Sequence, residues 1–263
     1  MIPWFNITFP SLGPLTIHMF GVLVAIGILV GARLTQKRGE ELGLEREQVA
    51  SMVTTILVCG FIFAHIFDVF AYQTKGPSPT LWEILNPFGG LSSYGGFIGA
   101  LVGLYYWCWR HDQKVMPYAD SLGFGLAAGW TFGRLGCFTA HDHPGHLTNF
   151  FLAVQYPNGA RHDLGLDEAL WALGVTIVFL ILNRKKQPLG LYVGLLATLY
   201  GPVRFALDFL RATDLSGSDP RYFALTPAQW LSTLVFVAGV IVLWWTARHA
   251  RAQKVGESSS VKS

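Results

Sequence analysis

The sequence predicts an all-α polytopic membrane protein with about seven transmembrane helices, the N-terminus outside and the C-terminus cytoplasmic. Three observations carry this prediction. Of the 263 residues, 52% are hydrophobic and 13% are charged, whereas roughly a quarter of the residues of a soluble domain are charged. The apolar residues form runs about as long as a bilayer core is thick, roughly 20 residues of helix. The basic residues between these runs are distributed unequally between the two sides.

Each apolar run is expected to be a helix, because lipid offers the backbone no hydrogen-bond partner and period-two alternation is absent. The runs are 15–32, 49–71, 88–109, 119–138, 169–182, 189–210 and 226–246. The fifth run is short, so the start of its helix is the least defined. We predict a single transmembrane domain over residues 1–246 with an outer loop at 139–165. Residues 247–263 are basic and rich in serine, and are predicted to form a disordered cytoplasmic tail.

The orientation follows from the lysine and arginine residues in the loops, which accumulate on the cytoplasmic side. The odd-numbered loops and the C-terminal tail carry 13 of them, and the N-terminus and even-numbered loops carry four. This asymmetry predicts that the N-terminus is outside. The net charge of +3 is then explained by attraction to the anionic inner leaflet, and no nucleic-acid partner is expected.

With this topology, unusual polar residues gather on the outer side. An ionisable residue within a membrane helix is costly and usually faces a cavity or a partner. The residues are His18, His65, Asp68, Tyr94, Arg134, His141, Asp142, His143, His146, Arg161, His162, Arg204, Asp208 and Arg211. Because several helices send such residues to one level, we predict one polar cavity near the outer leaflet.

Two features of this set indicate an anion site. Tyr200, Arg204, Asp208 and Arg211 are spaced to share one helix face, and Asp208 can pair with either arginine. Such pairs could also serve only to fix helix positions. Arg134 has no acid near it in the sequence, so its partner must come from elsewhere in the fold or from a ligand. A guanidinium suits phosphate, because its fork donates two parallel hydrogen bonds.

Two sets of glycines repeat every four residues, a spacing that lets membrane helices approach closely. They are Gly95, Gly99 and Gly103 in the third run, and Gly125, Gly129 and Gly133 in the fourth. We predict that the third and fourth helices pack on each other through these faces.

Five ordered motifs resemble those of the prolipoprotein diacylglyceryl transferase family. They are GGLSSYGGFIG (89–99), GRLGCF (133–138) followed by Asp142 and Gly145, RHDLGLDEAL (161–170), LYGPVRFALDFLR (199–211) and TPAQWLS (226–232). IHMFGVLVAIG (17–27) resembles the first-helix pattern of the family more loosely. The resemblance covers most of the chain, and the family's seven-helix topology with an outside N-terminus agrees with the loop charges.

The resemblance implies an enzyme of the bacterial cytoplasmic (inner) membrane whose active site faces the outer leaflet. It implies transfer of the diacylglyceryl group of phosphatidylglycerol to the lipobox cysteine thiol of a prolipoprotein signal peptide. A thioether forms and glycerol 1-phosphate is released, which is the first step of lipoprotein maturation. Residues 1–246 would be the catalytic domain, and no cofactor or metal is expected.

The resemblance also implies site residues. The chemistry needs cations to stabilise the leaving phosphate and a base for the thiol, because the thiolate is the nucleophile. The predicted catalytic residues are Arg134, Arg204, Tyr94 and Asp142, and His141 and His143 are added because of their residue type and place. The predicted substrate-binding residues are Tyr200, Asp208, Arg211, Gly95, Gly96, Arg161, His162 and Glu168.

The chain departs from the family pattern near the expected base. Tyr94 stands where the family usually has histidine, and Cys137 stands where it usually has asparagine. Tyrosine has an ordinary pKa near 10, so it is a poor base at neutral pH. Either the base has moved to His141 or His143, a residue type suited to the task, or the chain is a divergent relative with another acceptor or none.

Three alternatives accompany this interpretation. Residues 141–146 contain three histidines and an aspartate, which are ligands that zinc accepts, although Pro144–Gly145 is also typical of a turn. Cys137 could be a nucleophile with His141 as its base. A different class is a non-catalytic lipid-binding protein or a transporter of anionic solutes. The one-sided polar residues and the absence of an inverted repeat argue against the transporter.

Overall fold

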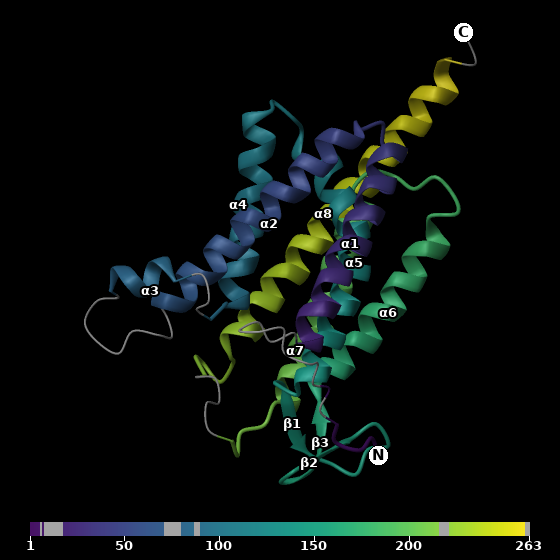
Figure 1. Ribbon diagram of the computed structural model, residues 1–263. Helices are drawn as coiled ribbons and strands as arrows, with labels where there is room; N and C mark the ends of the chain where they lie inside the picture. The colour runs from purple at the N-terminus through teal and green to yellow at the C-terminus, as the bar shows by residue number, and fades with distance from the viewer. Residues whose placement is uncertain (6, 8–17, 71–79, 87–89, 216–220, 261–263) are drawn as a thin grey trace. The chain divides into compact units, whose positions relative to one another are not determined.

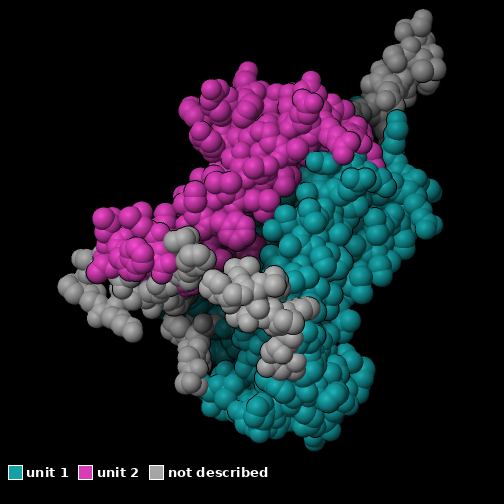
Figure 2. All heavy atoms as spheres, viewed as in Figure 1, with its two compact units in different colours: residues 1–38, 120–263 teal, residues 39–119 magenta. Residues whose placement is uncertain are grey.

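The computed structural model describes residues 1–5, 7, 18–70, 80–86, 90–215 and 221–260 (Figure 1). The chain divides into two compact units, coloured in Figure 2. Unit 1 comprises Met1–Arg38 and Asp120–Ser263, and unit 2 comprises Gly39–Ala119. The single transmembrane domain over 1–246 stays a prediction.

Every predicted apolar run is helical over most of its described length, which agrees with a mainly helical polytopic membrane protein. The helices are α1 Met19–Glu41, α2 Arg46–Asp68, α4 Ser93–Arg110, α5 Val115–Ala140, α6 Leu164–Leu182, α7 Leu191–Leu207 and α8 Pro227–Ser260. A short α3 (Leu81–Leu85) precedes α4, and a 3-10 turn, η2 (Asp208–Leu210), continues α7. By length and composition, α1, α2, α6, α8 and α7 with its η2 extension are apolar enough to cross a membrane. The glycine-rich helices α4 and α5 are not among these five.

The outer loop predicted at 139–165 contains a small antiparallel sheet that the sequence did not predict. Its strands are β1 Pro144–Leu147, β2 Val154–Tyr156 and β3 Gly159–Asp163, in the order β1-β3-β2. The N-terminus joins it, because Ile2 forms a parallel bridge with Val154. The sheet lies between the end of α5 and the start of α6 in the chain. In space it lies next to these helix ends (Figure 1).

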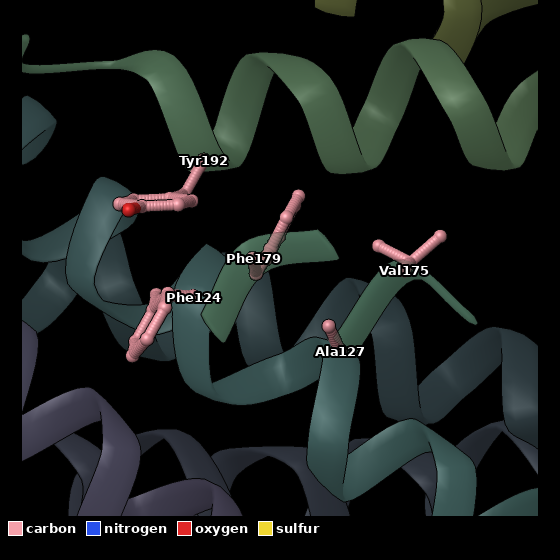
Figure 3. Close-up of a cluster of buried hydrophobic side chains, with 5 residues drawn as sticks. All are labelled: Phe124, Ala127, Val175, Phe179 and Tyr192. Atoms are coloured by element: carbon pink, nitrogen blue, oxygen red, sulfur yellow. The ribbon is translucent and has the colours of Figure 1, made fainter. Parts of the chain in front are cut away.

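The core of unit 1 holds α5, α6 and α7 together. Phe124 of α5, Phe179 of α6 and Tyr192 of α7 are buried and face one another (Figure 3). Beside them Asp120 accepts a hydrogen bond from the Tyr192 backbone N–H at 2.8 Å and pairs with Arg38 at 2.8 Å. These contacts of Asp120 hold α1, α5 and the start of α7 together. They lie at the end of the helices that is away from the sheet.

The two glycine faces have other partners than we predicted. A Cβ on Gly129 of α5 would lie 3.1 Å from the Gly27 carbonyl oxygen of α1, and one on Gly103 of α4 would lie 3.0 Å from Ile56 Cα of α2. Gly133 has nothing within 4 Å. The prediction that the third and fourth helices pack through these faces is wrong, because small-residue spacing predicts a close approach and leaves the partner open.

The last helix is longer than expected. α8 continues to Ser260, so residues 247–260, which we predicted to be disordered, are helical. Alanine, arginine, glutamine and lysine follow Thr246 in this stretch, and these residues favour helix.

Candidate active site

The ends of α5, α6 and α7 bring together an arginine cluster, which we define as Arg134, Arg204 and Arg211 with Glu168 and Asp208. Glu168 bridges two of the arginines. Its Oε2 lies 2.8 Å from Arg134 Nε, and its Oε1 lies 3.5 Å from Arg204 Nε. The Glu168 side chain is 3% exposed, and each arginine is 13% exposed. Arg134 has no acidic residue near it in the sequence, and the structure shows that its acidic partner is Glu168 of α6.

Glu168 reaches Arg134 because the start of α6 lies against the end of α5. The Asp163 carboxylate caps α6 by accepting the Leu166 N–H at 3.0 Å. A Cβ on Gly165 would lie 2.8 Å from the Phe138 backbone nitrogen of α5, so only glycine permits this approach without a shift. Glu168 follows less than one turn later, facing the same helix.

The predicted pairing along α7 is confirmed. Asp208 Oδ1 accepts from Arg204 Nη1 at 3.1 Å and lies 3.9 Å from Arg211 Nε. The other carboxylate oxygen accepts a short hydrogen bond from the Thr226 hydroxyl. Thr226 and Gln229 form a reciprocal cap at the start of α8, so the last helix fixes the buried Asp208.

The cluster has an excess of positive charge and of hydrogen-bond donors. Three guanidiniums face two carboxylates, and they carry more N–H donors than these acids can accept. Aromatic rings enclose it on one side. Tyr200 interacts with Arg134 and packs against Trp130 and Trp171, with ring centroids 5.7 and 5.5 Å apart. Such a site can bind a phosphate group.

His143 and Asp142 lie at the edge of the arginine cluster. His143 Nδ1 is 2.5 Å from Asp142 Oδ1, and His143 Nε2 is 3.5 Å from Arg134 Nη1. The His143 side chain is 26% exposed. Cys137 lies on the same side, with its Sγ 3.9 Å from Arg134 Nη1. A side chain with access to solvent and to the cluster can exchange protons there.

His141 has a different environment, although it is two residues away. His141 directly follows α5 and has a positive φ of 51°. Its buried ring stacks on Trp4, with ring centroids 4.2 Å apart. Nδ1 lies 3.3 Å from Asp163 Oδ2, and Nε2 lies 3.1 Å from the Phe5 carbonyl oxygen. Tyr156 also donates to this Asp163 oxygen, at 2.7 Å, and burial together with Asp163 raises the Tyr156 pKa. Among the described residues, His141 has no contact with the arginine cluster.

The predicted substrate-binding pair in β3 is engaged within the loop region. The Arg161 guanidinium is buried and donates to both oxygens of Asp214, at 2.9 and 2.5 Å, and to the Gly145 carbonyl at 3.0 Å. This pairing raises the Arg161 pKa and lowers the Asp214 pKa. His162 Nδ1 lies 3.8 Å from Asp167 Oδ2. In the described part of the chain, neither Arg161 nor His162 contacts the arginine cluster.

Three predicted site residues belong to unit 2. Tyr94 and Gly95 lie in the first turn of α4, and Gly96 follows. The Tyr94 ring lies 6.5 Å from that of Phe67 in α2. A Cβ on Gly95 would lie 2.9 Å from Ala64 Cα, so this glycine allows α4 to approach α2.

A metal fits the site poorly. Cys137, Asp142 and His143 offer ligand atoms within 4.8 Å of one another, and zinc usually takes about four ligands. Arg134 Nη1 lies beside both His143 Nε2 and Cys137 Sγ. The positively charged guanidinium would therefore repel a metal ion bound to these two atoms. His141, a ligand of the metal alternative, is engaged elsewhere.

Comparison with known proteins identifies the family. The family model described as prolipoprotein diacylglyceryl transferase matches residues 7–245. The chain belongs to the prolipoprotein diacylglyceryl transferase family. This match confirms the resemblance seen in the motifs, and it extends over both units.

Curated relatives agree over nearly the whole length. The chain is 28% identical to the phosphatidylglycerol–prolipoprotein diacylglyceryl transferase of Tolumonas auensis, over 91% of this chain and 95% of the relative. It is 27% identical to that of Vibrio parahaemolyticus, over 92% and 91%, and 26% identical to that of Chromohalobacter salexigens, over 91% of both.

Sequence reasoning missed two contributors to the site in this diacylglyceryl transferase relative. Thr226 was part of a quoted motif, but its contact with Asp208 was not foreseen. The T-x-x-Q spacing of Thr226 and Gln229 was the available signal, because it is typical of a helix cap. Gly165 gave no comparable signal, because a single glycine does not reveal which backbone approaches it.

Proposed function

We propose that this chain transfers the diacylglyceryl group of phosphatidylglycerol to the lipobox cysteine thiol of prolipoproteins. The observation that carries the proposal is the arginine cluster, in which Arg134 and Arg204 are held by one buried carboxylate in a chain that matches this family from residue 7 to 245. The products are a thioether and glycerol 1-phosphate. The curated relatives named after this reaction support the assignment.

The reaction displaces a phosphate at carbon. The cysteine thiolate donates an electron pair to the glyceryl carbon, a C–S bond forms, and the C–O bond to phosphate breaks with its pair on oxygen. Negative charge therefore grows on the phosphate as it leaves. We assign Arg134 and Arg204 to this charge, because donors fixed in advance stabilise the transition state without reorganisation. Glu168 and Asp208 hold the two guanidiniums in place.

Further roles follow from the resemblance. Tyr200 and Arg211 would orient the phosphate beside Arg134 and Arg204. Tyr94 is assigned to the reacting groups, and Gly95 and Gly96 to the lipid. Arg161 and His162 are assigned to the acceptor peptide, since they lie on the sheet beyond the helix ends.

The membrane arrangement is also part of the proposal. We assign seven spans to α1, α2, α4, α5, α6, α7 and α8, with the N-terminus outside and the C-terminal end of α8 in the cytoplasm. The bilayer is the bacterial cytoplasmic membrane. The arginine cluster would then face the outer leaflet, where a secreted prolipoprotein presents its signal peptide. The loop charges support this orientation.

The test is lipid transfer in detergent, with purified protein, labelled phosphatidylglycerol and a peptide that contains a lipobox cysteine. We expect labelled peptide from the wild-type chain and its loss in R134A and R204A. R134K and R204K keep the charge but not the fork, so they should retain a small part of the activity. R184A is the matched control, because Arg184 is exposed and lies in the loop after α6.

The outcomes separate the classes of function. Full activity in both R134A and R204A would refute the assignment of the arginine cluster. No labelled peptide from folded wild-type protein that binds the lipid would refute the transferase and favour a lipid-binding or anion-transporting protein.

A further inference from the structure

The resemblance leaves the base of the reaction open in this chain, because it implies a histidine where the chain has Tyr94. Two histidines of the outer loop were candidates. Their contacts differ in one respect that decides between them, namely whether a ring nitrogen directs a lone pair at an N–H donor of the arginine cluster.

His141 directs no such lone pair. Both of its ring nitrogens lie against acceptors, Asp163 Oδ2 at 3.3 Å and the Phe5 carbonyl oxygen at 3.1 Å. Both contacts are made inside the loop region, so neither ring nitrogen is directed at the arginine cluster. The side chain is 3% exposed and is stacked on Trp4. His141 therefore fastens the N-terminal segment to the sheet.

His143 has the opposite arrangement. Asp142 Oδ1 lies 2.5 Å from Nδ1, and a carboxylate at this distance accepts a proton from Nδ1 and orients the ring. Nε2 faces Arg134 Nη1 at 3.5 Å, and a guanidinium can only donate. The backbone is held as well, because the His143 carbonyl accepts the Leu164 N–H at 3.0 Å. The ring is thus a fixed acceptor at the edge of the cluster.

We propose that His143, oriented by Asp142, is the general base that takes the proton from the acceptor cysteine. This rests on the proposed function. The thiol S–H bond breaks, its proton passes to His143 Nε2, and the sulfur electron pair forms the C–S bond. The C–O electron pair leaves with the phosphate of glycerol 1-phosphate. The imidazolium then returns its proton to that phosphate beside Arg134, which restores neutral His143.

Asp142 is a positioning residue in this scheme. A nucleophile whose base is oriented by a third group is a recurring arrangement, and here the acceptor thiol comes from the other substrate. Among the described residues, the charged and titratable groups that face the His143 ring are Asp142 at Nδ1, Arg134 at Nε2, and Cys137 next to Arg134.

The experiment measures transfer from labelled phosphatidylglycerol to the lipobox peptide as a function of pH. In H143Q we expect kcat to fall about 100-fold or more at neutral pH. The acidic limb of the pH profile, which reports the protonation of the base, should disappear with it. H143A should be partly rescued by added imidazole, and R134A should not be rescued. D142N should lower kcat about tenfold or more with little change in the KM for peptide.

Two histidine controls accompany these variants. H146Q removes a histidine three residues further along the chain, in β1, and should leave the transfer rate unchanged. H141Q should lower the melting temperature while the protein that stays folded keeps its pH profile.

The possible results distinguish a wrong assignment of the base from a wrong function. A wild-type chain that transfers the lipid, with an H143Q variant of equal kcat and an unchanged acidic limb, overturns the assignment of the base and leaves the function intact. Loss of activity in H143Q without imidazole rescue of H143A, and with an unchanged acidic limb in the residual rate, overturns it too. A folded wild-type chain that transfers nothing overturns both this inference and the proposed function.

Discussion

Replacement of Glu168 by glutamine tests whether one buried acid organises the arginine cluster. Glutamine keeps the size of the side chain and removes the charge that faces Arg134 Nε at 2.8 Å and Arg204 Nε at 3.5 Å. Removing one partner of a buried ion pair leaves an uncompensated charge and typically costs about 3–5 kcal/mol. Because the Glu168 side chain is 3% exposed, water compensates little.

We expect E168Q to lower the free energy of unfolding by about 3 kcal/mol, the lower end of that range. The reason is that the glutamine oxygen still accepts one hydrogen bond. For a chain of this size that lowers the melting temperature by roughly 6–12 °C. Most of the protein stays folded at 25 °C, since native stability is typically about 5–15 kcal/mol. Transfer should fall by more than the loss of folded protein, because the two guanidiniums now repel each other and lose their alignment.

The assay compares melting in detergent and lipid transfer for E168Q and D167N. Asp167 is the matched control, because it directly precedes Glu168 in α6 and lies 3.8 Å from His162, with its side chain 19% exposed. D167N should change stability by no more than about 1 kcal/mol. Equal melting temperatures and equal transfer rates in the two variants would refute the argument that Glu168 organises the cluster.

Three further predictions concern the surroundings of the site. Because pairing with Arg161 lowers the pKa of Asp214, the stabilisation is present above the ordinary aspartate pKa near 3.9 and is lost as the pH falls through the lower folded value. The difference in melting temperature between wild type and D214N should therefore shrink between about pH 5 and pH 3, and a constant difference would contradict it. G165A should cost about 1–3 kcal/mol and lower transfer, because the added Cβ meets the Phe138 nitrogen; G174A, with open space around it, should match or exceed wild-type stability. A chelator should leave melting and transfer unchanged, and loss of either would restore the metal alternative.

The helices were predictable because each depends on local composition. An apolar run of about 20 residues has one stable form in lipid, so the seven helices follow from the sequence alone. The sheet depends on pairing between short strands, and β1, with the sequence PGHL and an irregular register against β3, carries no alternation that would signal a strand. Its existence comes from tertiary contacts such as those of Arg161 with Gly145 and Asp214.

The site was predictable in its residue types and less so in its geometry. The spacing of Arg204, Asp208 and Arg211 lies within one helix end, so their pairing could be foreseen. The Arg134–Glu168 pair joins two helices through the close approach at Gly165, which one sequence does not reveal. The sequence alone does not distinguish His141 from His143, because they are of one residue type and two positions apart. The turn at His141, with its positive φ, directs the two rings into different surroundings.

The charges of the site suggest how it could distinguish the lipid from the transition state. Three arginines face Glu168 and Asp208, and Asp142 lies beside His143, so three formal positive charges meet three formal negative charges. A phosphodiester brings one negative charge, and a phosphate monoester carries about 1.5–2 near neutral pH. If His143 takes the thiol proton, a positive charge appears next to Arg134 while the leaving phosphate gains its second negative charge. Stabilisation then grows along the reaction rather than at lipid binding, which is the condition for raising kcat. An H143Q variant should accordingly keep its affinity for phosphatidylglycerol while its turnover falls.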